Sequence, residues 1–132
     1  MDADGVHLGQ EDMPSEVARV LLGVDRLLGR STHSIDQVHQ AQQEPIDYLG
    51  FGPIHSTAVK PERNPVGVEL LAKATAISQR PVFAIGGITP ANLPALLTAG
   101  GQRAAVIGAI MHADDSGQAT RHLLQQLDQA TI

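Results

Sequence analysis

The chain has 132 residues, of which 42% are hydrophobic and 17% are charged, a balance typical of one globular domain spanning residues 1–132. Its net charge of −5 and its 2% of aromatic residues argue against a nucleic-acid-binding surface, which needs basic and stacking side chains. The absence of cysteine excludes disulfides and thiolate metal sites, and no apolar run is long enough for a membrane span, so we expect a cytoplasmic protein.

Short apolar segments alternate with longer amphipathic ones along the whole chain. This alternation is typical of strand–helix units around a parallel sheet. The predicted strands are 5–8, 27–30, 46–51, 81–85 and 103–107. The sequence therefore predicts an α/β fold of five units.

Local residue types indicate where the helices begin. Pro14 precedes a predicted helix that ends near Leu22, and its apolar face carries Val17, Val20 and Leu21. Ser34 is a predicted N-cap, with Gln37 as its capping-box partner. Thr89 is predicted to cap a later helix with Pro90 in its first turn.

The turns after the strands are the candidate binding residues, because ligands of parallel α/β proteins bind at the carboxyl ends of strands. The irregular segment 52–65 is the longest of these turns, and loops of that length are often functional. Gly86 and Gly87 follow one strand, and Ile107 and Gly108 end the next. Their backbone amides would suit a phosphate, although such glycines also serve only to make tight turns.

Charged and titratable residues in the same turns suggest further chemistry. Asp12, next to Glu11, is a candidate Mg²⁺ ligand, or else part of a solvated acidic turn. Lys60 could meet a diphosphate as a point charge, with Arg63 as a second cation. His33 is a candidate acid–base residue, or else bonds only the neighbouring loop.

Five segments in chain order resemble motifs of the thiamine-phosphate synthase family. They are Ala3 to Asp12 (ADGVHLGQED), Gly29 to His33 (GRSTH), Asp47 to Ile54 (DYLGFGPI), the segment around Thr57 and Lys60, and Ala84 to Ile88 (AIGGI). The resemblance implies an enzyme that joins 4-amino-2-methyl-5-(diphosphooxymethyl)pyrimidine to a thiazole phosphate, releases diphosphate and uses Mg²⁺.

The resemblance also implies roles for individual residues. Asp12 matches a Mg²⁺ ligand, while Ser31 and Lys60 match contacts to the pyrimidine diphosphate. The matching contacts to the thiazole phosphate are Thr57, Gly86, Gly87, Ile107 and Gly108. The catalytic candidates are Lys60 and Ser31, as contacts to the diphosphate, and His33, as the acid–base candidate named above.

The implied fold is a TIM (β/α)₈ barrel, truncated here to about five βα units. The family's Q-x-R-x-K segment and its N-D pair, which holds the other Mg²⁺ ligand, are absent. Five strands cannot close such a barrel, so we expect a homo-oligomer or a partner to cover the open edges. Two alternatives remain, a thiazole tautomerase using His33 and an inactive remnant that binds thiazole phosphate.

Overall fold

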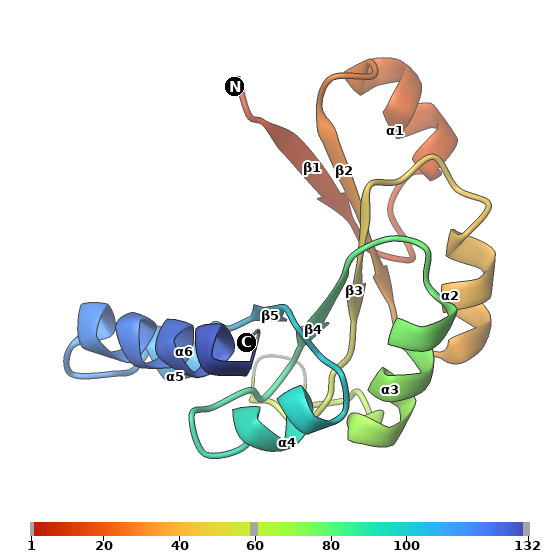
Figure 1. Cartoon of the computed structure of the whole chain (residues 1–132). Coiled ribbons are helices and arrows are strands. Elements are labelled where there is room, and N and C mark those ends of the chain that lie inside the picture. Colours follow the sequence, from red (N-terminus) through yellow and green to blue (C-terminus); the bar gives the residue numbers. More distant parts are fainter. Residues whose placement is uncertain (1, 59–60, 131–132) are drawn as a thin grey trace.

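A computed structural model describes residues 2–58 and 61–130 of the chain. Its centre is one sheet of parallel strands in the order β1-β2-β3-β4-β5, so each strand pairs with its neighbours in sequence (Figure 1). The strands are β1 Gly5–Leu8, β2 Leu27–Thr32, β3 Tyr48–Phe51, β4 Val82–Ile85 and β5 Ala104–Ala105. The predicted five-strand parallel sheet is therefore confirmed, with β3 and β5 shorter than expected.

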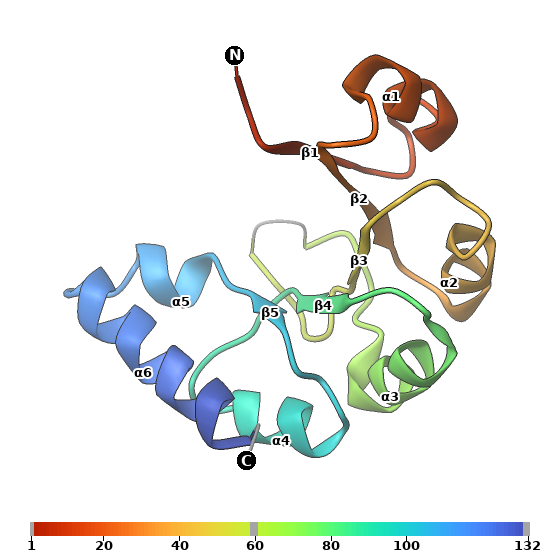
Figure 2. The same cartoon turned by 45° about the horizontal axis from the view of Figure 1, so that its top comes forward.

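The helices follow the strands, and all except the short α5 lie along the outer, convex side of the sheet (Figure 2). They are α1 Ser15–Leu22, α2 Ile35–Ala41, α3 Gly67–Ile77, α4 Leu93–Thr98, α5 Gly108–Met111 and α6 Ser116–Ala130. The predicted cap of α2 is confirmed, since Ser34 Oγ accepts a hydrogen bond from the Gln37 amide at 3.2 Å.

The predicted start of the helix after β4 is wrong by one turn. Helix α4 begins at Leu93, not at Pro90, and Asn92 is its N-cap residue. Thr89 and Asn92 exchange side-chain hydrogen bonds with each other's amides, which closes a separate turn ahead of the helix. The predicted cap residue Thr89 thus stabilises this turn together with Asn92, instead of the first turn of α4.

Side chains of the strands alternate between the two faces of the sheet, as the pleat requires. On β2, Leu28, Arg30 and Thr32 are buried, facing the helices. The buried hydrophobic core between sheet and helices includes Leu28, Leu49, Phe51, Leu71, Leu93 and Leu96.

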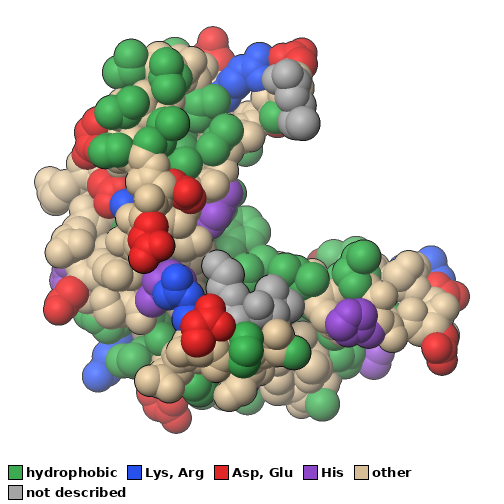
Figure 3. Space-filling view, turned by 180° about the vertical axis from the view of Figure 1, so that it is seen from behind, with side chains coloured by type: hydrophobic (Ala, Val, Ile, Leu, Met, Phe, Trp, Pro, Cys, Tyr) green, Lys and Arg blue, Asp and Glu red, His purple; other side chains and the backbone are tan. Residues whose placement is uncertain are grey.

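The opposite face of the sheet is concave and open. Figure 3 shows the hollow beside it from behind, with the molecule curved around it. Side chains on this face form a cavity wall that includes His7, Ser31, Tyr48, Phe83 and Ile85. Tyr48 packs against Phe83 edge to face, with ring centroids 5.4 Å apart.

Helix α1 packs poorly for its composition. Its buried residues are the small Ser15 and Ala18, whereas Val20 and Leu21 are 83% and 72% exposed. The predicted apolar face therefore exists but turns away from the sheet, and Figure 3 shows hydrophobic side chains gathered over this end of the molecule. Among the described residues, no helix is long and apolar enough to cross a bilayer.

Candidate functional site

The carboxyl ends of β2 to β5 surround a cavity of about 450 Å³. The walls come from turns that are far apart in sequence and meet because the strands are parallel. Seven residues singled out from the sequence line this cavity, namely Ser31, His33, Thr57, Gly86, Gly87, Ile107 and Gly108. Lys60, the predicted diphosphate cation, lies outside the described residues.

The Gly86–Gly87 turn can be built only from glycine. Both residues have positive φ angles, 102° and 62°. A Cβ atom on Gly86 would lie 2.5 Å from Pro53 Cβ, and one on Gly87 would lie 2.6 Å from Ser56 O. The turn is thus in close backbone contact with the segment that follows β3.

Hydrogen bonds hold this turn against that segment. The amides of Ile54 and His55 donate to the carbonyls of Ile85 and Gly86 at 2.9 and 3.1 Å. From the other side, Asn92 Nδ2 donates to the Gly87 carbonyl at 2.8 Å. The backbone of Gly87 is therefore fixed before any ligand arrives.

The Gly87 and Gly108 amides are the candidate anion donors. Within the described residues, no hydrogen bond uses either amide as its donor. Gly108 opens the four-residue helix α5, and both glycines line the same cavity. An anionic oxygen placed there would meet backbone N–H groups that have no competing acceptor.

His33 is anchored to the loop after β3. Its Nδ1 lies 2.6 Å from the Gly52 carbonyl oxygen. Because a carbonyl only accepts, Nδ1 carries the proton, and in the neutral ring Nε2 is left as an acceptor. Both readings of His33 therefore fit its geometry, since the ring bonds the loop and also lines the cavity.

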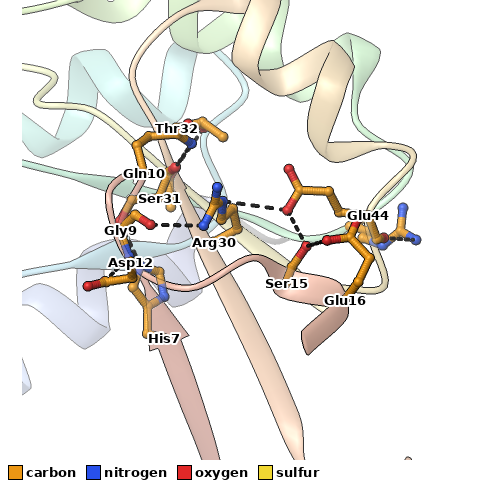
Figure 4. Close-up of polar contacts among 12 residues, drawn as sticks. His7, Gly9, Gln10, Asp12, Ser15, Glu16, Arg30, Ser31, Thr32 and Glu44 are labelled. Atoms are coloured by element: carbon orange, nitrogen blue, oxygen red, sulfur yellow. Dashed lines mark hydrogen bonds and ion pairs between the residues drawn. The ribbon is translucent and has the colours of Figure 1, made fainter. Parts of the chain in front are cut away.

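The turn after β1 carries the candidate metal ligand. Asp12 Oδ2 accepts a 2.6 Å hydrogen bond from the Gly9 amide, and Asp12 itself is exposed. Gln10 Nε2 donates to the Ser31 carbonyl at 2.6 Å, which ties the turn to β2. Figure 4 shows these residues packed together at the ends of β1 and β2.

Arg30 holds the same turn from beneath. Its Nη1 donates to the Gly9 carbonyl at 2.9 Å, and its Nε lies 3.5 Å from Glu44 Oε2. That carboxylate oxygen also accepts a 2.6 Å hydrogen bond from Ser15 Oγ. A partly buried ion pair, with no hydrogen bond from Arg30 Nε, thus connects the β1 turn with helix α1 and the end of α2 (Figure 4).

The donors available for a divalent cation are few. No group of three or more His, Cys, Asp or Glu side chains among residues 2–58 and 61–130 could hold a metal ion. Asp12 keeps one carboxylate oxygen that is not bonded to Gly9, which suits Mg²⁺ as a single ligand beside substrate phosphates and water. Asp12 does not line the cavity described above.

Two titratable groups on the concave face have shifted pKa values. Desolvation by burial lowers the pKa of His7, partly opposed by the negative charge of Asp12. Burial raises the pKa of Tyr48. Both shifts favour the neutral forms of these two side chains.

The structure adds residues that were not predicted as binding residues. These residues are Ser56 and His112, which line the cavity. Arg63, which was predicted as a second cation for a diphosphate, also lines it. His112 follows Gly108 by four residues, one helical turn, and this spacing could have identified it. No sequence pattern indicated Asn92, which holds the Gly87 carbonyl, because that contact depends on the folded shape of the turn.

Comparisons with known proteins place these features in a family. A family model described as thiamine monophosphate synthase matches residues 1–110. The thiamine-phosphate synthase of Synechococcus sp. (strain CC9605) is 96% identical over all 132 residues, and that of Parasynechococcus marenigrum (strain WH8102) is 57% identical over the same span. The chain spans 38% of the length of each of these curated relatives.

A solved structure is also similar. It is the thiamine phosphate pyrophosphorylase from Pyrococcus furiosus, with a TM-score of 0.89 and 37% identity. The similarity covers 98% of this chain and 61% of that one. The open five-stranded sheet therefore matches part of a larger α/β structure.

Proposed function

Because the chain belongs to the thiamine monophosphate synthase family, we propose that it binds thiazole phosphate and serves the coupling of that molecule to a pyrimidine diphosphate. The observation that carries the proposal is the single cavity shared by Thr57, Gly87 and Gly108. Two rigid, unbonded amides there are suited to a phosphate. The chain spans 38% of the length of its first curated relatives, so the coupling reaction itself is part of the proposal.

In the proposed reaction the bond between the pyrimidine methylene carbon and the diphosphate oxygen breaks, and the thiazole nitrogen forms a bond to that carbon. Diphosphate leaves with both bonding electrons. No protein nucleophile is needed, so the chain's contribution is to hold the two substrates and to stabilise the negative charge that develops. Ser31, by donating a hydrogen bond, and Lys60, by its charge, are the proposed contacts to the leaving group.

Mg²⁺ bound beside the diphosphate would neutralise part of the leaving group's charge. We assign Asp12 as one of its protein ligands, because the Gly9 amide orients the carboxylate and leaves one oxygen for the cation. Arg30 and Gln10 keep the turn in place from the β2 side.

A tautomerase is the second candidate, favoured by the geometry of His33. Its Nδ1 proton is committed to the Gly52 carbonyl, so Nε2 is free to take a proton from a thiazole carbon acid within the cavity. A third candidate is a remnant that binds thiazole phosphate without catalysis.

Titration calorimetry and product analysis separate these candidates. We expect thiazole phosphate to bind the chain, and Gly87→Ala to abolish that binding. Adding pyrimidine diphosphate and Mg²⁺ gives thiamine phosphate only if the chain is a synthase. Exchange of thiazole protons that His33→Asn removes would instead identify a tautomerase, and binding without either reaction would identify a remnant. No binding at all would overturn the proposal.

The two outer strands, β1 and β5, each leave one edge unpaired within the described residues. Open edges and an uncovered concave face favour association. We therefore propose that a second copy or a partner covers them, which sedimentation at several concentrations tests directly.

A further inference from the structure

The concave face holds a hydrogen-bonded row of side chains that the proposed reaction does not yet use. His7 Nδ1 lies 3.0 Å from Tyr48 Oη, and His7 Nε2 lies 2.8 Å from Ser31 Oγ. The three residues come from β1, β3 and β2. Ser31 is the proposed contact to the pyrimidine diphosphate, so this inference rests on the proposed function.

Glycines on the central strands make this row possible. In the sheet register His7 is opposite Gly29 on β2, and Gly29 is opposite Tyr48 on β3. A Cβ atom on Gly29 would overlap the Tyr48 ring and lie 2.5 Å from His7 Nδ1. Any side chain there would separate the two rings. The missing side chain at Gly29 lets His7 and Tyr48 meet across the strand between them.

The protonation of the two rings limits the direction of the hydrogen bonds. Desolvation keeps His7 neutral, so one ring nitrogen donates and the other accepts. Burial keeps the Tyr48 hydroxyl protonated. A phenol is more acidic than an aliphatic alcohol and hence the stronger donor, while its oxygen is the weaker acceptor. The favoured arrangement has Tyr48 O–H donating to Nδ1 and His7 Nε2–H donating to Ser31 Oγ.

We propose that His7, oriented by Tyr48, is a positioning residue. Its Nε2–H group donates a hydrogen bond to a lone pair of Ser31 Oγ, so the Ser31 hydroxyl proton is left to donate to an anionic oxygen in the cavity. The unprotonated oxygens of a diphosphate can only accept hydrogen bonds, so they require Ser31 as donor. If the hydrogen bonds ran the other way, Ser31 would donate its proton to His7 Nε2 and only lone pairs of Ser31 Oγ would face the anion.

The tautomer of His7 is the first test, and it needs no ligand. We expect nuclear magnetic resonance of the isotope-labelled chain at neutral pH to show His7 protonated at Nε2. Tyr48→Phe keeps the ring packing against Phe83 but removes the donor to Nδ1, so it should increase the fraction of the Nδ1–H form. A wild-type ring protonated at Nδ1 would overturn the inference, whatever the chain binds.

The second test measures binding of inorganic diphosphate with Mg²⁺ by calorimetry. His7→Leu should weaken binding about tenfold, the usual size for losing one oriented hydrogen bond to a charged group. His7→Gln, which keeps an N–H donor near Nε2, should retain most of the affinity. Adding His7→Leu to Ser31→Ala should cause no further loss, because the His7 effect acts through Ser31.

The outcomes distinguish this inference from the proposed function. If Ser31→Ala leaves diphosphate affinity unchanged, or if wild type binds none, the proposed role of Ser31 is wrong and the His7 inference, which acts through Ser31, is overturned with it. If Ser31→Ala weakens binding but His7→Leu does not, the positioning role is wrong and the proposed function stands. Thermal melting of each variant identifies any that fails to fold.

Discussion

The two ends of the sheet differ in how complete they are. Around β4 and β5 the Gly86–Gly87 turn, Asn92 and the segment after β3 hold one another in place and enclose a cavity. Around β1, the turn with Asp12 is well anchored, but the apolar face of α1 remains uncovered. The comparison teaches that the described residues enclose the candidate phosphate site, whereas the turn with the candidate metal ligand Asp12 lies beside a helix whose apolar face is uncovered.

The largest expected effect on stability and ligand binding comes from Gly87→Ala, which changes the turn at the β4–β5 end of the sheet. The new Cβ atom would lie 2.6 Å from Ser56 O at a φ of 62°, so the turn must move. We expect loss of thiazole phosphate binding and a decrease in unfolding free energy of roughly 2–4 kcal/mol, the sum of overpacking and backbone strain. Calorimetry and chemical denaturation measure the two quantities.

Gly100→Ala is the matched control for that variant. Gly100 also has a positive φ, 89°, but a Cβ atom there meets nothing within 4 Å. Only backbone strain of about 1–2 kcal/mol should appear, with ligand binding retained. Equal loss of binding in both variants would mean that strain alone, and not contact with Ser56, controls the site.

Arg30→Met tests the anchor at the other end. The substitution leaves Glu44 without its buried partner and frees the Gly9 carbonyl. We expect a destabilisation of about 2 kcal/mol, from the lost hydrogen bond to Gly9 and the broken, partly buried ion pair, together with weaker Mg²⁺-dependent binding of diphosphate. Arg26→Met, which removes the exposed pair with Asp2, should cost less than about 1 kcal/mol. Similar losses in the two variants would contradict a special role for Arg30.

The apolar face of α1 sharpens the comparison further. Val20→Glu together with Leu21→Glu should change the unfolding free energy of the isolated subunit by less than about 0.5 kcal/mol, because both side chains are already exposed. The same pair should reduce concentration-dependent association in sedimentation, if that face is covered by a second copy. Unaltered association would place the contact elsewhere.

The smallest effect concerns acid stability. Burial would raise the pKa of Asp47, but hydrogen bonds from the Leu28 amide and Arg19 outweigh it and lower the pKa below its ordinary value of 3.8. This contribution to stability is therefore complete above about pH 5 and is lost as the pH falls through the folded-state pKa. Asp47→Asn should make the unfolding free energy less dependent on pH in that acidic range. An unchanged slope would show that other carboxylates dominate.

Many residues of the candidate site could be predicted from the sequence, because the signals that indicate turns and helix ends are local. Glycines directly after a strand, a Ser before a helix and a long irregular segment each act within a few residues. The parallel arrangement then brings all strand ends to one edge. Gly87 and Gly108 were singled out from their places after strands, and Ser31 and Thr57 from the family resemblance, before their common cavity was seen.

Contacts across strands could not be found in that way. His7 and Tyr48 are 41 residues apart, and their hydrogen bond exists only because Gly29 separates them in the register. The pairing of Arg30 with Glu44 and the outward face of α1 likewise depend on where whole elements pack. Strands, turns and the candidate phosphate site were thus encoded by neighbouring residues. The direction in which side chains point, and the residues to which they bond across strands and helices, were decided by the tertiary structure, since only folding brings distant groups within bonding distance.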